Sequence, residues 1–287
     1  MEFVRLSDAA LDCLLTDDAP LGDLTTHLLG IGRLHGRMTF AARGAMVAAA
    51  VEDAARLLER AGCVVERVAA SGDRLPAGAA ILAAEGTAAA LHRGWKMAQL
   101  LIETASGIAT TTRTIVEAAR AAHPDVAVAG TRKTVPGAKA LSIAALVAGG
   151  AVPHRLGLSE TILIFAEHRA FLGTLTPAET VAQVRRGAHE RKIVVEVGAV
   201  DEAVAWAAAG ADVIQTEKFT PAMVGELTAR LREVAPQTII AAAGGIGADT
   251  AGSYVAAGAR VIVTSAPYTA KPLDVAVRIA PAAKPAT

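Results

Sequence analysis

Short runs of β-branched and aliphatic residues recur along the second half of the chain, each followed by polar residues and then a helical pattern. The last four begin some 20 to 26 residues apart, which is the length of a strand–helix unit with short loops. Runs that are apolar almost throughout predict strands buried on both faces, as in a parallel sheet. We therefore expect an α/β barrel, with a doubly wound sheet as the alternative that periodicity leaves open. The runs begin at Val126, Thr161, Lys192, Asp212, Thr238 and Arg260.

The segment before Pro124 predicts a mixed arrangement of helices and strands. Ser7 is a typical N-cap for a first helix, and Gly62 is a typical stop for another. A chain of 287 residues is long enough for one large domain or two smaller ones. Helices are expected after Ser7 and over residues 51–61 and 87–122, and strands are expected within residues 37–50, 64–68 and 80–82.

The charge and hydrophobicity of the chain exclude two classes of protein. The 28 Lys and Arg residues balance 28 Asp and Glu residues, so the chain lacks the basic field of a general nucleic-acid-binding protein. A hydrophobic fraction of 53% also excludes a disordered chain. A folded protein with a core of its own is therefore expected.

Membrane insertion and disulfide bonding are not expected either. The longest apolar stretch, residues 138–152, contains Gly149-Gly150 and is shorter than a membrane span. The start of the chain lacks the pattern of a signal peptide, so we expect a cytoplasmic protein. Cys13 and Cys63 are too few for a disulfide framework or a four-ligand zinc site, and we expect both to be buried apolar residues.

Charged and small residues follow most of the predicted strands, where the active site of an α/β barrel lies. They comprise four cationic or ionisable donors, two carboxylates and four small residues at the last two loops. Guanidinium and ammonium groups bind phosphate oxygens, and carboxylates hold Mg²⁺ together with waters and substrate phosphates. We therefore expect an anionic, phosphate-bearing substrate and a Mg²⁺ ion. The residues are Arg132, Lys133, His154, Arg155, Glu196, Glu217, Gly244, Gly245, Thr264 and Ser265.

Taken singly, most of these residues have an ordinary structural explanation. An Arg-Lys pair is usually a solvated surface, and a pair of glycines after a strand is usually a turn. Glu196 differs because it interrupts an apolar run, and burying an unpaired carboxylate is unfavourable. The occurrence of all these residues at successive strand ends favours a functional site.

Two motifs among these residues are similar to motifs of the quinolinate phosphoribosyltransferase (nicotinate-nucleotide pyrophosphorylase) family. They are Thr-Arg-Lys-Thr-Val-Pro-Gly at residues 131–137 and His-Arg-Leu-Gly-Leu at residues 154–158. Further matches make the resemblance span almost the whole chain. These lie at residues 22–26, 106–110, 195–197, 257–259 and 273–274.

The resemblance implies an α/β fold of the type II phosphoribosyltransferase kind. Residues 1–110 would form an N-terminal α/β sandwich domain, residues 111–267 an open α/β (TIM-like) barrel, and residues from about 268 to 287 would return to the first domain. It also implies a homodimer, or a higher oligomer, with shared active sites. The reaction would transfer phosphoribosyl from 5-phosphoribosyl 1-pyrophosphate (PRPP) to a small-molecule acceptor and release pyrophosphate, as in the formation of nicotinate mononucleotide from quinolinate.

The resemblance also implies a role for each candidate residue. Arg132, Lys133, His154 and Arg155 would bind anions as catalytic residues. Glu196 and Glu217 would be the carboxylates on the metal side, and Glu217 stands where the family usually has Asp. Near the ribose 5-phosphate, the resemblance places Gly244, Gly245, Thr264 and Ser265.

Three departures from the family pattern concern the acceptor. Phe165 stands where the family has a lysine that contacts the acceptor, and Lys96 where it has an arginine reaching across the dimer. Ala241 replaces a glutamate three residues before the glycine pair. A quinolinate site must bind two adjacent carboxylates, and arginine and lysine differ in bidentate carboxylate binding, so the changes at Phe165 and Lys96 weaken the prediction of quinolinate as acceptor. The pattern resembles instead the ModD branch of the family, which is named for its association with molybdenum transport.

Two other functions are compatible with the residues. A ligand- or oxyanion-binding protein would keep the fold without the reaction, and the loss of the lysine at Phe165 motivates it. A Schiff-base aldolase would use Lys133 or Lys218, but it needs a lysine with a lowered pKa in an apolar pocket. We rank the transferase first and the aldolase last.

Overall fold

The chain folds into two compact units, and the structure, a computed structural model, describes residues 5–282. The first unit comprises residues 5–113, 134–150 and 267–282. The second comprises residues 114–133 and 151–266. Residues 134–150 therefore group with the first unit, whereas the boundary expected from the sequence placed them in the barrel.

An antiparallel sheet in the order β13-β1-β5-β3 forms one layer of the first unit. Burial alternates along β1, where the fully buried Met38 and Phe40 stand on either side of the exposed Thr39. One face of the sheet therefore faces a core, to which α1, α3 and α4 also contribute residues. The strands are β1 (His35–Ala42), β3 (Val64–Arg67), β5 (Ala80–Thr87) and β13 (Val275–Pro281), with β2 (Met46–Val47) and β4 (Arg74–Leu75) paired separately. The helices are α1 (Asp8–Asp18), α2 (Leu24–Leu28), α3 (Val51–Ala61), α4 (Ala88–Ala122) and α5 (Lys139–Ala148).

The Ser-Gly-Ile-Ala-Thr motif on α4 has a structural role within the first unit. The Ser106 hydroxyl accepts a hydrogen bond from the Ala49 N–H at 3.1 Å, and the Thr110 hydroxyl accepts one from the Val47 N–H at 2.8 Å. A Cβ at Gly107 would approach the carbonyl oxygen of Lys271 to 2.3 Å. Glycine is therefore required for this close contact between α4 and the backbone of Lys271.

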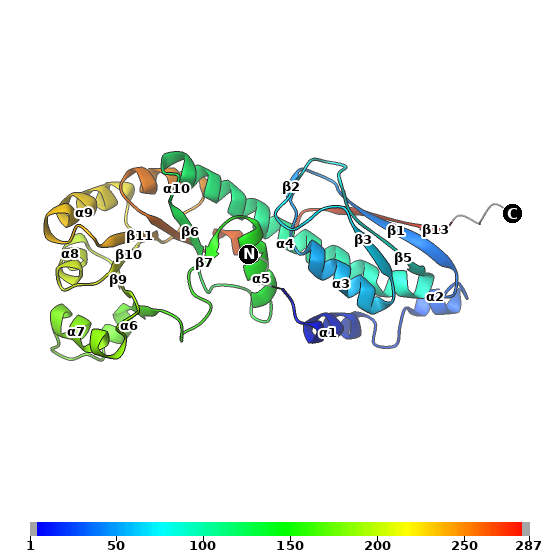
Figure 1. The fold of residues 1–287 in the computed structure, drawn as a ribbon, viewed down its shortest axis with the longest axis horizontal. Coiled ribbons are helices and arrows are strands. Elements are labelled where there is room, and N and C mark those ends of the chain that lie inside the picture. Colours follow the sequence, from blue (N-terminus) through cyan, green and yellow to red (C-terminus); the bar gives the residue numbers. More distant parts are fainter. Residues whose placement is uncertain (1–4, 283–287) are drawn as a thin grey trace. The chain divides into compact units, whose positions relative to one another are not determined.

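A parallel sheet in the order β7-β6-β12-β11-β10-β9-β8 forms the centre of the second unit. The sheet curls, and helices α8 to α10 lie along its outer side (Figure 1). Strands β7 and β8 form its two edges, which makes the barrel open, as the family resemblance implies. The strands are β6 (Ala127–Gly130), β7 (Val152–Pro153), β8 (Ile162–Ile164), β9 (Ile193–Val197), β10 (Val213–Glu217), β11 (Ile239–Ala243) and β12 (Val261–Thr264). The helices are α6 (Ala166–Arg169), α7 (Pro177–Gly187), α8 (Val200–Ala208), α9 (Pro221–Val234) and α10 (Ala248–Ala256), and the 3₁₀ helix η1 (Ala266–Thr269) follows β12.

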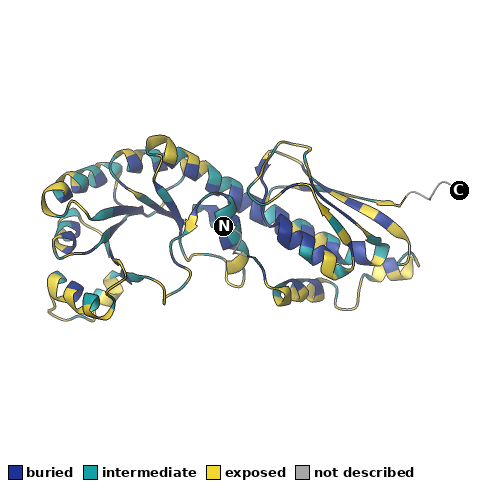
Figure 2. Cartoon of the chain, viewed as in Figure 1, coloured by how far each residue is buried: buried dark blue, intermediate teal, exposed yellow. Residues whose placement is uncertain are grey.

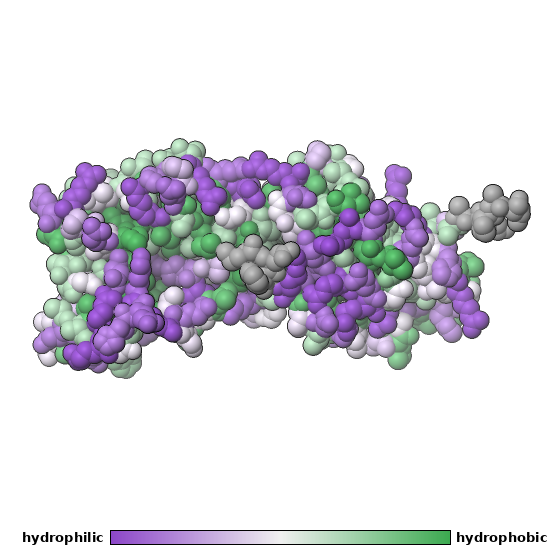
Figure 3. Space-filling view, viewed as in Figure 1, coloured by the Kyte–Doolittle hydropathy of each residue, from purple (hydrophilic) through white to green (hydrophobic). Residues whose placement is uncertain are grey.

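Burial in the second unit follows this arrangement. The strands are mostly buried, while the helices expose their outer faces (Figure 2). Hydrophilic side chains gather over α6 and α7 on the face shown in Figure 3. Ala241, Ala243 and Val263 form a small buried cluster on the inner side of the sheet. Small side chains at these positions leave space for a cavity at the end of the barrel.

The structure corrects one expectation about the cysteines. Cys63 is buried, and burial raises the pKa of its thiol to about 11. Cys13 is exposed on α1, so the prediction that both cysteines are buried is wrong for Cys13. Among the helices of residues 5–282, we find none with the length and apolar character needed to cross a membrane.

Candidate active site

A cavity of about 440 Å³ opens at the C-terminal ends of the strands of the second unit. All seven strands, or the residues that directly follow them, contribute to its lining, which is where α/β barrels carry their active sites. The sequence-predicted residues that line it are Arg132, Lys133, His154, Arg155, Phe165, Glu196, Glu217, Gly244, Gly245, Thr264 and Ser265. The sheet therefore brings together residues that are up to 133 positions apart in the sequence.

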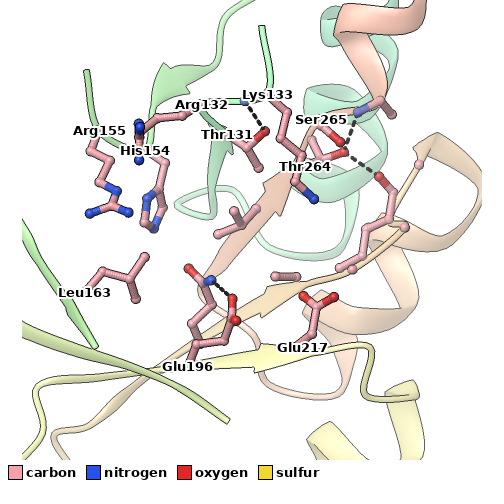
Figure 4. A pocket seen from close by; sticks show the side chains of 18 of the residues that line it. Thr131, Arg132, Lys133, His154, Arg155, Leu163, Glu196, Glu217, Thr264 and Ser265 are labelled. Carbon is pink, nitrogen blue, oxygen red and sulfur yellow. Dashed lines mark hydrogen bonds between the residues drawn. The ribbon is translucent and has the colours of Figure 1, made fainter. Parts of the chain in front are cut away.

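Cationic side chains form one wall of the cavity. Arg132 and Lys133 follow β6, and His154 and Arg155 follow β7, the neighbouring strand. The His154 N–H donates to the Gly130 carbonyl at 2.9 Å, which holds the two loops together. Figure 4 shows His154 and Arg155 on this wall and Lys133 extending toward the two glutamates.

Arg155 is unusual because it is a buried arginine without an acidic partner among the described residues. The residue is only 9% exposed, and no ion pair joins it to a carboxylate among residues 5–282. Burial and the charge of Arg132 lower the pKa of Arg155. Burial and the charge of Arg155 lower the pKa of His154, which favours the neutral form of its imidazole. The wall therefore carries positive charge that the protein does not neutralise, as an anion-binding site requires.

Two carboxylates and an amide stand on the opposite wall. Glu196 on β9 pairs in register with Gln215 on β10, and Glu217 ends β10 two residues further on. Side chains alternate along a strand, so Gln215 and Glu217 face the same side. The Gln215 Nε2 donates to the Glu196 Oε2 at 2.6 Å, which fixes that carboxylate at the cavity wall.

The end of β9 is fixed from outside the cavity by Arg169 on α6. The guanidinium donates to the Glu196 carbonyl at 2.6 Å and to the Glu202 carboxylate at 2.7 Å. It also lies over the Trp206 ring, 5.8 Å from its centroid. These contacts tie α6 and α8 to the strand that carries Glu196.

Glu196 and Glu217 fit a magnesium site that is completed by the substrate. Burial raises the pKa of Glu196, and repulsion from Glu217 adds to this increase, while the hydrogen bond from Gln215 opposes it. A divalent cation between the two carboxylates would relieve that repulsion. Residues 5–282 contain no cluster of three or more acidic, His or Cys ligands. Mg²⁺ in particular is often held by one or two carboxylates with substrate phosphates as the other ligands.

The loops after β10, β11 and β12 are closely packed on the far side of the cavity. Gly244 has a φ of +98°, and a Cβ there would lie 2.6 Å from the backbone nitrogen of Lys218. The Thr264 hydroxyl donates to the Ile246 carbonyl at 2.7 Å and accepts from the Ala266 N–H at 3.1 Å. Only glycine allows this approach of the β11 loop to the β10 loop, so Gly244 shapes the cavity rather than contributing a side chain.

Two lysines considered in the sequence analysis lie elsewhere. Lys96 is on α4 in the first unit, exposed, with its ammonium 3.0 Å from the Gln99 Oε1 and 5.0 Å from the centroid of the Trp95 ring. Lys218 has a positive φ of 57°, and its side chain is 80% exposed beside Glu217. A solvated lysine next to a carboxylate is a poor Schiff-base nucleophile, so the aldolase has no support at Lys218.

Sequence reasoning missed two polar residues of the cavity, Gln215 and Asp249. Gln215 could have been found from the alternation along its strand, because it stands two residues before Glu217 in an apolar run. It is 4% exposed, and its Oε1 has no hydrogen-bond partner among the described residues. Asp249 lies in the first turn of α10, and apart from its charge the sequence contains no pattern that would assign it to the cavity.

Solved structures identify the fold. The structure of NadC from Streptococcus pyogenes matches with a TM-score of 0.87 and 24% identity, over 96% of each chain. A nicotinate-nucleotide pyrophosphorylase from Francisella tularensis matches with a TM-score of 0.85 and 20% identity, over 96% of this chain and 98% of the other. At such identities the likeness shows the fold alone, which is the type II phosphoribosyltransferase fold.

The sequence then identifies the family. It matches the N-terminal domain of quinolinate phosphoribosyl transferase over residues 23–106 and the C-terminal domain over residues 108–278. The chain therefore belongs to the quinolinate phosphoribosyltransferase family. It is an enzyme of the pentosyltransferase class, and the expectation from the two motifs is confirmed.

Relatives with the ModD name are more similar to the chain than those with the carboxylating name. A Rhodobacter capsulatus protein named "Putative pyrophosphorylase ModD" is 45% identical over 262 residues, which cover 91% of this chain and 95% of the relative. The human nicotinate-nucleotide pyrophosphorylase [carboxylating] is 29% identical over 241 residues, or 84% and 80% of the two chains. The resemblance to the ModD branch is therefore confirmed.

The raised pKa of Glu196 predicts a pH-dependent gain in stability for Glu196→Gln. Burial disfavours the ionised carboxylate, so the folded wild type is destabilised at pH values above that pKa. The variant should be more stable at pH 8, by at most about 1 kcal/mol because the group is still partly hydrated. The difference should shrink as the pH falls toward 4.5, where Glu196 takes up its proton in the folded chain.

Chemical denaturation at a series of pH values measures this difference in stability, with Glu190→Gln, at an exposed site, as control. Equal stability of Glu196→Gln and wild type at pH 8 would refute it.

Proposed function

We propose that the cavity binds PRPP with Mg²⁺ and transfers its phosphoribosyl group to the nitrogen of a small heteroaromatic acceptor. The observation that carries this proposal is the buried residue Arg155, which lacks an acidic partner among the described residues and lies across the cavity from a wall with two carboxylates. A cation that is left unpaired in a cavity is suited to an anionic ligand. Carboxylates opposite the cations would repel that anion unless a metal ion came with it, and PRPP carries its pyrophosphate as a magnesium complex.

In the reaction, the bond from the ribose C1 to the pyrophosphate oxygen breaks, and a bond from C1 to the acceptor nitrogen forms. The nitrogen lone pair supplies the electrons of the new bond, and pyrophosphate leaves with the old pair. A pyridine-like nitrogen carries no proton, so no general base is needed. Mg²⁺, when bound, neutralises the charge of the departing pyrophosphate.

The residues of the chain contribute positioning and electrostatic stabilisation, which dominate when the transition state resembles an oxocarbenium ion. Arg132, Lys133 and Arg155 would bind the anionic groups of the two substrates, and His154 would donate a single N–H. Glu196 and Glu217 would hold the metal ion. Backbone N–H groups near Gly245 and Ser265 would receive the 5-phosphate, as the last two loops of such barrels often do.

A binding protein without catalysis would need only the cationic wall. The carboxylate wall distinguishes a transferase from an oxyanion receptor, because two glutamates that repel each other would have no role in binding an oxyanion. The position of Glu196 and Glu217 in the same cavity as Arg155 therefore favours the transferase.

The metal assignment predicts the behaviour of two glutamate variants. Glu196→Ala and Glu217→Ala should each weaken Mg²⁺-dependent PRPP binding by roughly tenfold or more, because each removes a metal ligand, and about 1.4 kcal/mol corresponds to a factor of ten. Isothermal titration of PRPP with and without Mg²⁺ measures the effect, and Glu190→Ala serves as control. If wild type binds no PRPP, the proposed function is wrong. Unchanged affinity in both variants would reject the metal assignment only.

Phe165 predicts slow turnover of quinolinate. Two adjacent carboxylates on an acceptor need several cations, and a charged hydrogen bond contributes about 1.5–3 kcal/mol. Without the lysine of the family pattern, we expect a kcat/KM for quinolinate below roughly 10⁴ M⁻¹s⁻¹. An assay for released carbon dioxide with PRPP and Mg²⁺ measures it. Phe165→Lys should raise this value, whereas Phe171→Lys, at a residue 92% exposed, should not. Efficient turnover by wild type would place the chain with the carboxylating enzymes.

We also propose that the chain is a homodimer in which Lys96 serves the active site of the partner. The family resemblance and the exposed position of Lys96 on α4 support this proposal. Lys96→Ala and Arg132→Ala chains should each be inactive alone. A mixture should recover activity, because one hybrid site then has both residues. Native mass spectrometry confirms that subunits have exchanged, and no recovery after exchange would contradict a shared site.

A further inference from the structure

Arg155 needs a partner that orients its guanidinium, and the structure shows one that carries no charge. The Arg155 Cζ lies over the Phe165 ring, 5.6 Å from its centroid. No hydrogen bond or ion pair to this guanidinium is found within residues 5–282. A guanidinium within about 6 Å of an aromatic centroid is attracted to the ring, most strongly where water is excluded. The ring is thus the contact that holds Arg155 in the ligand-free protein.

The Phe165 ring is itself held in place by the next turn of the chain. Phe165 is the N-cap residue of α6, and its backbone N–H donates to the His168 Nδ1 at 3.0 Å. The His168 ring stacks on the Phe165 ring, with centroids 5.8 Å apart and planes inclined by 18°. The Nδ1 accepts this bond, which fixes the orientation of the His168 ring relative to the backbone of Phe165. A ring fixed by both backbone and stacking can orient a neighbour.

We propose that Phe165 is a positioning residue for Arg155, which it holds through its ring while leaving the charge and the N–H donors free for an anion. The donors of a guanidinium lie in its plane and remain available when its face rests on an aromatic ring. A carboxylate at this position would hold Arg155 equally well but would neutralise it. A lysine would leave the charge but would repel Arg155 until an anion arrived.

This role differs from that of an aromatic platform for the acceptor. The ring face that Arg155 covers is not available for stacking with a heteroaromatic acceptor. Phe165 therefore acts on the substrate through Arg155, and its contribution should vanish when the guanidinium is removed. The inference rests on the proposed function only for the identity of the anion, since the contact itself exists without any ligand.

A double-mutant cycle tests the contact in the ligand-free chain. The variants are Phe165→Leu, Arg155→Met and both together, with Phe171→Leu as the matched control at an exposed phenylalanine. Chemical denaturation of the full chain gives the unfolding equilibrium constant of each. We expect a coupling of roughly fivefold or more between Phe165 and Arg155, the size of a partly desolvated cation–π contact. Phe171→Leu should show no coupling with Arg155→Met, and Phe165→Tyr should keep the wild-type value.

The same variants then separate the two roles in ligand binding. Titrations with PRPP plus Mg²⁺ and with quinolinate show which anion Arg155→Met weakens. For that ligand, Phe165→Leu should weaken binding about threefold to tenfold in the wild-type background and have no further effect in the Arg155→Met background. Equal losses in both backgrounds would show that Phe165 contacts the acceptor directly, and an absent coupling in the denaturation cycle would also overturn the inference. If neither anion binds wild type while the coupling persists, the proposed function fails and the positioning contact stands.

Discussion

The parallel register of the second sheet is the constraint on which the active site depends. Parallel strands end at the same edge, so the residues at seven strand ends meet around one cavity although the chain between them is long. The pairing of Glu196 with Gln215 shows that the strand register determines which side chains meet in the cavity. A shift of one residue in either strand would turn one of the two side chains to the helix-covered face. The hydrogen bond between them, at 2.6 Å, thus depends on the register.

The register also keeps opposite charges apart. Arg155 and Glu196 belong to different walls of the cavity, and strands held by backbone hydrogen bonds do not move to let them form an ion pair. Their pKa values record the unfavourable result, lowered for Arg155 and raised for Glu196. An arginine that no carboxylate of the described residues neutralises suits the binding of an anion, which is the role proposed for this cavity.

The sequence predicts most of the fold because its signals are local. Continuous β-branched runs mark β9 to β12, and the stop at Gly62 marks the end of α3. The boundary between the two units was less accessible, since residues 134–150 follow a barrel strand and yet pack with the first unit. That grouping depends on tertiary packing, which no local pattern encodes. The prediction that Cys13 is buried was wrong for a similar reason. Which side of α1 is exposed depends on how the helix packs, and Cys13 lies on the exposed side.

The sequence shows which residues are charged, but it does not show which of them interact in the folded chain. Charged residues at strand ends are visible in a sequence, so Arg132, Glu196 and Glu217 could be named. Gln215 was overlooked because a neutral amide in a strand gives no such signal. Its hydrogen bond to Glu196 depends on the register between β9 and β10. The contact between Arg155 and Phe165 joins two loops at non-adjacent strands, so only the fold reveals it.

Phe165 connects the charge of the cavity to the choice of acceptor. A lysine at this position adds one positive charge, which a second carboxylate on the acceptor can satisfy. Phenylalanine removes that charge and still orients Arg155, so the wall keeps a well-placed guanidinium while its total charge falls by one. Under the proposed function, the acceptor that complements this wall would have one negative charge fewer than quinolinate, and binding a dicarboxylate would leave one carboxylate desolvated against an aromatic edge. Because an unpaired buried charge is more unfavourable than a missing favourable contact, this single exchange would then discriminate against the more highly charged acceptor rather than merely bind it less well.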